Sequence, residues 1–299
     1  MGSASQTRDY GVGGVVVPGR WHAAVRSLVR DYSALAGGVI FFLMVMSGIF
    51  APVLSHYDPI AQNTRIRLQG SSRVHLLGTD DFGRDIFTRL LYGSRSIMLI
   101  AFVSIILALV AGTSLGALAG YFGDWAELLI MRLTDVMLAF PLVLLAIVIV
   151  VALGPGTSNL ILAIGISQIP IFARLAHSLT LSVRYREYVQ AARCLGSSDR
   201  HILISHILPN IATPLLVQAT TTMALAILSA TALNFLGLGI QPPTSDWGAM
   251  IADFRRFIFD RPLLALYPGM AIAVTVLSLN LLSDALIEIL DPTTRRMLG

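Results

Sequence analysis

Few residues in this chain could carry out chemistry, and their spacing matches none of the common catalytic patterns. All 21 basic residues are arginine, so the chain lacks the lysine of a G-x-x-x-x-G-K-[ST] phosphate-binding loop. If ATP drives this protein, another chain must hydrolyse it. His201 and His206 are five residues apart, which is not the H-E-x-x-H spacing, and the Gly165-Ile166-Ser167 segment lacks the rest of a G-x-S-x-G turn. We therefore predict no catalytic residue and no cofactor bound by this chain.

The cysteine and histidine residues do not form a disulfide or metal-binding pattern. Cys194 is the only cysteine, so no internal disulfide can form. Most of the histidines stand in separate segments, which predicts hydrogen-bonded or solvated side chains rather than a metal site. They are His22, His56, His75, His177, His201 and His206. An intramembrane enzyme is the weakest of the functional alternatives for the same reason.

The composition indicates an integral membrane protein. Of the 299 residues, 55% are hydrophobic and 13% are charged, whereas a soluble domain carries roughly a quarter charged residues. So few charges cannot cover a soluble surface unless much of that surface faces lipid. A soluble enzyme, a disordered chain and a disulfide scaffold all fit poorly. The net charge of +4 does not indicate a nucleic-acid partner, because the arginines are scattered through loops and span ends, where they anchor a protein at the membrane interface.

Six apolar stretches predict an all-α membrane protein with six transmembrane helices. The first, residues 33–54, is too long for a signal-peptide core and no A-x-A-like cleavage site follows it, so we predict an uncleaved span. The others cover about 96–120, 127–152, 158–180, 211–238 and 264–289. The predicted organisation is a tail at 1–32, the first span, an external segment at 55–95, a five-helix core at 96–290 with a cytoplasmic loop at 185–209, and a tail at 291–299. Arginine counts favour cytoplasmic termini by 12 to 9, which is a weak bias.

Small residues and prolines inside the spans predict local packing features. Gly112, Gly116 and Gly120 form a ridge at four-residue spacing, which lets another helix backbone approach closely. Pro141 and Pro170 free backbone carbonyls and bend helices, so they indicate either kinks around a central pathway or irregular packing.

Few charges fall near or inside the spans. Arg174 lies within the fourth apolar stretch, where it either faces a substrate pathway or extends toward the inner interface. Asp135 lies one turn from Arg132, which predicts a local ion pair at a helix end. Asp284 and Glu288 close the last span and are expected at the headgroup region.

The loop at 185–209 is the most informative polar segment. Residues 187–195 predict a short amphipathic helix, with Tyr188, Ala191, Ala192 and Leu195 on one face. Gly196 can supply the positive φ that ends such a helix. Ser198 or Asp199 can cap a second helix, and Pro209 ends or kinks it where the next span begins. A small-residue helix before a glycine turn suits a socket on a soluble partner, although an ordinary helix connection would have the same pattern.

At these residues the sequence resembles the ATP-binding-cassette importer permeases. Ala191-Ala192, Gly196 and Leu208-Pro209 match the family loop E-A-A-x-x-x-G…I-x-L-P, with Gln190 in place of the glutamate and His206 in place of the usual isoleucine. Three other segments resemble the dipeptide, oligopeptide and nickel branch. They are residues 75–85 (H-x-L-G-T-D-x-x-G-R-D), 235–248 (F-L-G-L-G-x-Q-P-P-T…W-G, lacking a proline after Thr244) and 280–292 (N-L-x-x-D…L-D-P).

This resemblance, which covers roughly residues 20–297, implies the C-type permease subunit of a type I importer. Its partners would be a second homologous permease, two ATP-binding subunits that carry the ATP and magnesium, and a periplasmic or lipid-anchored substrate-binding protein. The location would be the bacterial inner membrane, and the cargo a peptide or a related small solute. The resemblance assigns ATPase coupling to Glu187, Gln190, Ala191, Ala192, Gly196, Leu208 and Pro209.

The external segment at 75–85 allows two interpretations. Gly78 and Gly83 bracket Thr79, Asp80 and Asp81, and Arg84-Asp85 follow just before the second span. These residues form either a fixed structural corner, which we favour, or a contact for the binding protein or cargo.

A proton-coupled secondary transporter is the alternative function. Such a protein needs acidic or histidine residues deep in its spans and usually has inverted repeats. No repeat is obvious here, and the acidic residues cluster at helix ends.

Overall fold

The computed structural model describes residues 32–290, and within this range the fold is helical, with a single isolated bridge between Thr79 and Asp85. The predicted tail at 291–299 and residues 1–31 of the predicted tail at 1–32 lie outside the described residues. The longer helices are α2 (Tyr32–Ile49), α4 (Ile86–Phe122), α5 (Asp124–Leu138), α6 (Leu142–Leu153), α7 (Thr157–Arg184), α10 (Leu208–Phe235) and α12 (Pro262–Leu290). The short ones are α3 (Ala51–Leu54), η1 (Thr64–Ile66), α8 (Glu187–Cys194), α9 (Asp199–His201), η2 (Ile202–Ile207, a π-helix), α11 (Trp247–Phe254) and η3 (Arg255–Phe257).

Five helices in the described range are long and apolar enough to cross a membrane, and a sixth span is complete if α5 and α6 count as one. The predicted stretch at 127–152 is not one straight helix, because α5 and α6 meet at a bend of 95°. Pro141 stands in an extended conformation directly before α6 and explains the break, since proline disfavours a helical conformation in the preceding residue. At Pro170, by contrast, α7 continues without interruption.

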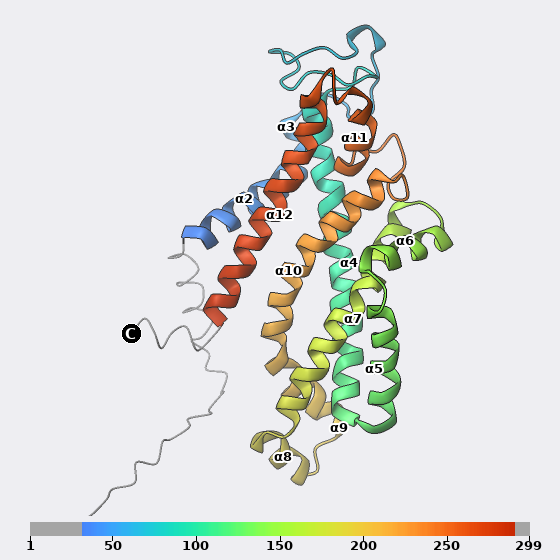
Figure 1. Ribbon diagram of the computed structural model, residues 1–299. Helices are drawn as coiled ribbons and strands as arrows, with labels where there is room; N and C mark the ends of the chain where they lie inside the picture. The colour runs from blue at the N-terminus through green and yellow to red at the C-terminus, as the bar shows by residue number, and fades with distance from the viewer. Residues whose placement is uncertain (1–31, 291–299) are drawn as a thin grey trace, which may run out of the picture.

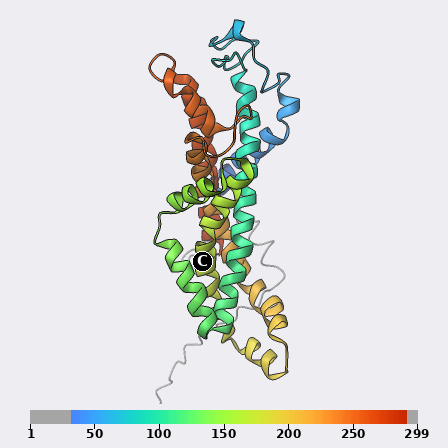
Figure 2. The same cartoon turned by 90° about the vertical axis from the view of Figure 1, so that its right-hand side faces the viewer.

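Figures 1 and 2 show α4 running the length of the bundle, with residues 55–85 gathered at one end and α8 and α9 at the other. We call these the corner end and the loop end. With 37 residues, α4 is about 55 Å long. The core lies between α4, α7 and α10, where Ile100, Phe172 and Ile227 are fully buried.

The predicted glycine ridge packs α4 tightly against α7. A Cβ atom at Gly112 would lie 2.6 Å from the Cβ of Phe172, and one at Gly116 would lie 2.1 Å from the carbonyl oxygen of Ala173. At Gly120 the nearest atom would be the carbonyl oxygen of His177, at 2.9 Å. Only hydrogen fits at these positions, so the two helix backbones pack in direct contact.

Candidate functional site

The connection between α7 and α10 at the loop end is a compact structure closed by Gly196. The amide of Gly196 donates to Arg193 O at 3.0 Å, and the amide of Ser197 donates to Ala192 O at 3.1 Å. This pair of bonds is a Schellman ending, and it requires the positive φ of +81° that Gly196 adopts, as predicted. A Cβ atom there would meet nothing within 4 Å, so backbone conformation alone, and not space, selects glycine.

The short helix α8 exposes most of the face that the sequence predicts. Tyr188, Ala191 and Leu195 are exposed, Leu195 to 87%, whereas Val189 and Ala192 are buried against the rest of the chain. Ala192 lies one turn from Tyr188 and from Leu195 and so shares their face, but at the edge next to Val189, where it is buried. Tyr188 is 38% exposed beside the ring of His206, and within residues 32–290 no segment covers Ala191 or Leu195.

A second, capped helix leads from α8 into α10. Ser198 caps α9 by accepting a hydrogen bond from the amide of His201, as predicted. The helix then passes through the π-helical turn η2 into α10, with Leu208 and Pro209 in its first turn. Pro209 therefore does not end the helix, and its missing N–H falls directly after the π-helical turn.

The two departures from the family loop both make contacts inside it. Gln190 donates from Nε2 to the carbonyl oxygen of Arg184 at 3.2 Å, which ties α8 to the last turn of α7. The ring of His206 lies 6.4 Å from that of Tyr188 and 5.6 Å from that of His201. Glu187 stands in the first turn of α8, where the helix dipole favours a negative charge.

A cluster that the sequence reasoning missed fastens this connection to the end of α4. The Tyr121 hydroxyl donates to Asp199 Oδ1 at 2.6 Å, and the Arg193 guanidinium lies 5.3 Å from the centre of the Tyr121 ring. Arg184 donates to the carbonyl oxygens of Gly120 and Tyr121. Tyr121 lies on α4, and its side-chain partners lie on α8 and α9. We name this cluster of Tyr121, Arg184, Arg193 and Asp199 the clasp.

At the corner end, Asp80 is fully buried and holds two arginines. Its Oδ2 accepts from Arg84 Nε and from Arg89 Nη1, both at 2.6 Å, and its Oδ1 accepts from the backbone amides of Phe82 and Arg84 at 2.9 Å. Arg84 and Arg89 are themselves buried. Their Nη2 atoms lie 3.9 and 3.6 Å from a carboxylate oxygen of Asp253 on α11.

The remaining motif residues shape the backbone of the corner. Gly78 and Gly83 have φ angles of +84° and +73°, and a Cβ atom at either would lie within 2.3 Å of a backbone oxygen. Thr79 Oγ1 accepts from the amide of Gln69 at 3.0 Å. Asp85 caps α4 by accepting from the amide of Thr88 at 2.8 Å, and its other oxygen lies 3.0 Å from His75 Nδ1.

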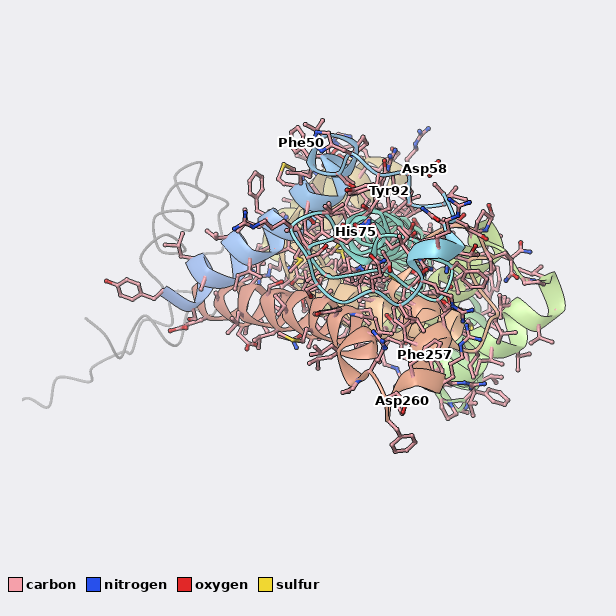
Figure 3. All side chains as sticks on the ribbon, turned by 90° about the horizontal axis from the view of Figure 1, so that it is seen from above. Phe50, Asp58, His75, Tyr92, Phe257 and Asp260 are labelled. Atoms are coloured by element: carbon pink, nitrogen blue, oxygen red, sulfur yellow. The ribbon has the colours of Figure 1, made fainter. Side chains whose placement is uncertain are left out.

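Seen from the corner end (Figure 3), His75 lies over α4 while Phe257 and Asp260 lie toward α12. The burial of the motif residues and their bonds to one another favour the structural corner over a contact for the binding protein or cargo. The sequence did not indicate Arg89, Asp253 or Arg256, which pairs with Asp81, because these residues meet the motif only after folding.

Arg174 forms an ion pair with Asp135 of α5 across the helix interface. The predicted pair between Asp135 and Arg132 is therefore wrong. Arg174 reaches Asp135 from the facing helix α7, and this neighbour could not be seen in the local spacing. His177 of α7 makes a second contact to α5, with Nε2 lying 3.0 Å from Glu127 Oε1.

Comparisons with known proteins agree with this architecture. Residues 112–296 match the model of the binding-protein-dependent transport system inner membrane component, and residues 19–70 match the N-terminal transmembrane domain of oligopeptide transport permease C. The chain belongs to this family of importer permeases. It is 45% identical to a dipeptide transport permease of Alkalihalophilus pseudofirmus, over 91% of this chain and 90% of the relative. It is 40% identical to a glutathione transport permease of Pectobacterium atrosepticum, over 91% of each, and 42% identical to a probable D,D-dipeptide permease of Escherichia coli, over 86% and 87%.

In this importer permease the family segment at 235–248 joins α10 to α11. Asn234 Oδ1 accepts from the amide of Ile240 at 2.8 Å, and Asp246 caps α11 by accepting from the amides of Gly248 and Ala249. Trp247 donates from Nε1 to Leu90 O at 2.9 Å, which ties α11 to α4. Burial raises the pKa of the Asp246 carboxyl to about 6.

Within residues 32–290, no three His, Cys, Asp or Glu side chains come together in a group that could hold a metal ion.

Proposed function

We propose that this chain is the C-type permease subunit of a bacterial inner-membrane importer for peptides or a related small solute. A second homologous permease completes the translocation path, a substrate-binding protein delivers the solute, and two ATP-binding subunits drive the cycle. The names of the similar permeases, which cover dipeptides and glutathione, support the solute class. This chain itself performs no catalysis and holds no cofactor in the proposal.

The exposed stripe of Tyr188, Ala191 and Leu195 is the observation that carries the proposal. An apolar surface on a polar connection is typical of a docking site for another protein. The clasp and the Schellman ending hold this stripe in a fixed orientation, so that movement of a docked ATPase reaches α4 and α7 directly.

Substitutions at Ala191 and Gly196 test this docking role. Ala191→Glu places a charge in the contact and should abolish ATP hydrolysis stimulated by the loaded binding protein, whereas Ala191→Ser keeps a small side chain and should retain it. Gly196→Val opposes the positive φ at a cost of about 1–2 kcal/mol, whereas Gly196→Asn tolerates it. Co-purification of the complex shows whether each variant assembles. Normal stimulated hydrolysis in Ala191→Glu would show that α8 is only a connector.

The proposal places the loop end in the cytoplasm together with both termini, and residues 55–95 outside. Single cysteines at Ser197 and Asn63, in a Cys194→Ser background, test this orientation with a membrane-impermeant thiol reagent. In intact spheroplasts only the Asn63 site should react. Reaction at Ser197 from outside would reverse the orientation.

A further inference from the structure

The ion pair between Arg174 and Asp135 is exposed on the surface of the membrane-spanning part of the chain. The side chain of Arg174 is 60% exposed and that of Asp135 is 47% exposed. The neighbouring exposed residues of α5 are Leu129, Leu133 and Val136, each 59–63% exposed, and the charged Arg132, one turn before Asp135. Three charged side chains therefore lie together on a surface that is otherwise mostly apolar.

Helix packing places this pair within the depth of the hydrocarbon core, in the half nearer the loop end. Gly116 of α4 contacts Ala173 and Ala176 of α7, so Arg174 lies about level with Gly116. Residues 96–123 carry no charged side chain, and Gly116 lies inside that run, about two turns before it ends. A run of this length covers the hydrocarbon core, which takes about 20 helical residues.

At that depth a pair that faces lipid is disfavoured. Charged side chains in the hydrocarbon core are costly and are found where they face a bundle interior or a water-filled cavity. The side chain of Arg174 does not lean toward the loop end. Side chains lean toward the N-terminus of their helix, and α7 begins at the other end. A second polar pair, Glu127 with His177, lies on the same seam between α5 and α7, nearer the loop end.

We propose that Arg174 and Asp135 line the translocation path and form a transient binding site for the charged ends of a zwitterionic peptide. The guanidinium of Arg174 offers paired donors that fit an α-carboxylate, and the carboxylate of Asp135 accepts from an ammonium group. Without solute, the two side chains neutralise each other. When a zwitterion binds, the pair between Arg174 and Asp135 is replaced by two pairs, one between Arg174 and the α-carboxylate and one between Asp135 and the ammonium group. The net charge of the site does not change. This inference rests on the proposed importer function and names the class of solute that its path accommodates.

Thiol accessibility in the assembled complex tests the first half of the proposal. Ser178 is exposed one turn from Arg174 on α7, so Ser178→Cys in a Cys194→Ser background leaves the ion pair intact. Methanethiosulfonate reagents, one anionic and one cationic, should modify the thiol of this variant in at least one of the resting, ATP-bound and vanadate-trapped states. Leu118→Cys, at nearly the same depth on an apolar and 40% exposed part of α4, is the matched control and should stay unmodified. A Ser178→Cys thiol that is inert in all three states would overturn the proposal and place this seam against the second permease.

The ratio of the two modification rates tests the second half. In the Ser178→Cys background, Arg174→Gln should lower the anionic-to-cationic rate ratio at least threefold, and Asp135→Asn should raise it by a similar factor. Each neutral variant should also lower the maximal uptake rate at least tenfold while the complex still binds the loaded binding protein. If the anionic-to-cationic rate ratio is the same in Arg174→Gln, in Asp135→Asn and in the parent variant, charge recognition is refuted.

Failure of this inference and failure of the proposed function give different results. If the wild-type complex shows no uptake that depends on ATP and on the binding protein, the proposed function fails. If wild-type uptake is normal and the Ser178→Cys thiol is inert, only the inference about the path fails.

Discussion

Replacing Asp80 by asparagine should remove most of the stability of the corner, because this one carboxylate holds two buried guanidinium groups. The asparagine oxygen can still accept from the amides of Phe82 and Arg84, but its NH₂ group would face the donors of Arg84 and Arg89. Breaking a buried ion pair costs about 3–5 kcal/mol, against a typical folding free energy of about 5–15 kcal/mol. The acid that then remains as an ion-pair partner for the arginines is Asp253, at 3.6 Å or more.

Arg84→Ala should be milder. Asp80 keeps Arg89 and the backbone amide bonds from residues 82 and 84, so the loss is about 1.5–3 kcal/mol, the range for a hydrogen bond to a charged group. Asp58→Asn changes an exposed carboxylate of the same segment and serves as the matched control. We expect the amount of co-purified complex to fall in the order control, Arg84→Ala, Asp80→Asn.

Binding of the loaded binding protein to the surviving complexes separates a structural corner from a recognition surface. A structural corner predicts near-normal affinity in the few Arg84→Ala complexes that assemble. Normal assembly with lost binding would refute the reasoning and assign Arg84 to recognition.

Three further predictions concern the clasp, Asp246 and the glycine ridge. Tyr121→Phe keeps the ring but removes its bond to Asp199, so the ratio of stimulated to basal ATP hydrolysis should fall severalfold in an assembled complex; an unchanged ratio would exclude the clasp from coupling. The pKa of Asp246 is raised from 3.8 to about 6, so the folded protein holds a proton that the unfolded chain releases, and stability falls by about 3 kcal/mol as pH rises through that window. Asp246→Asn should remove this slope in thermal melts and raise the melting temperature above pH 6; equal slopes would contradict the buried carboxylate. Gly116→Ala should lower the yield of folded protein because its Cβ would lie 2.1 Å from a carbonyl oxygen, whereas Gly269→Ala, in open space, should not; equal yields would contradict the packing.

The helical architecture could be predicted because it depends on local patterns. Apolar stretches placed the spans, although α4 begins at Ile86, ten residues before the predicted 96. The reason is that its first turns carry Thr88 and Arg89, whose polar groups are satisfied by the corner and not by lipid. The positive φ of Gly196 and the capping by Ser198 were likewise predictable, since both belong to short-range motifs.

Contacts between distant segments could not be predicted from local patterns. The partner of Asp135 is 39 residues away on α7, and the partner of Tyr121 is 78 residues away on α9. The burial of Ala192 depends on contacts with the rest of the chain, which a helical wheel for eight residues does not contain. Spacing thus identifies the turn and the face of the loop helix, while the division of that face into exposed and buried residues emerges only from the packed structure.

Uptake into proteoliposomes tests the central claim most directly. The complex of this chain with its second permease and ATP-binding subunits should import solute only when ATP is supplied on the side of α8 and loaded binding protein on the side of the corner. A proton ionophore should leave the uptake unchanged. Uptake that needs no ATP and collapses with the proton gradient would contradict the account and identify a secondary transporter.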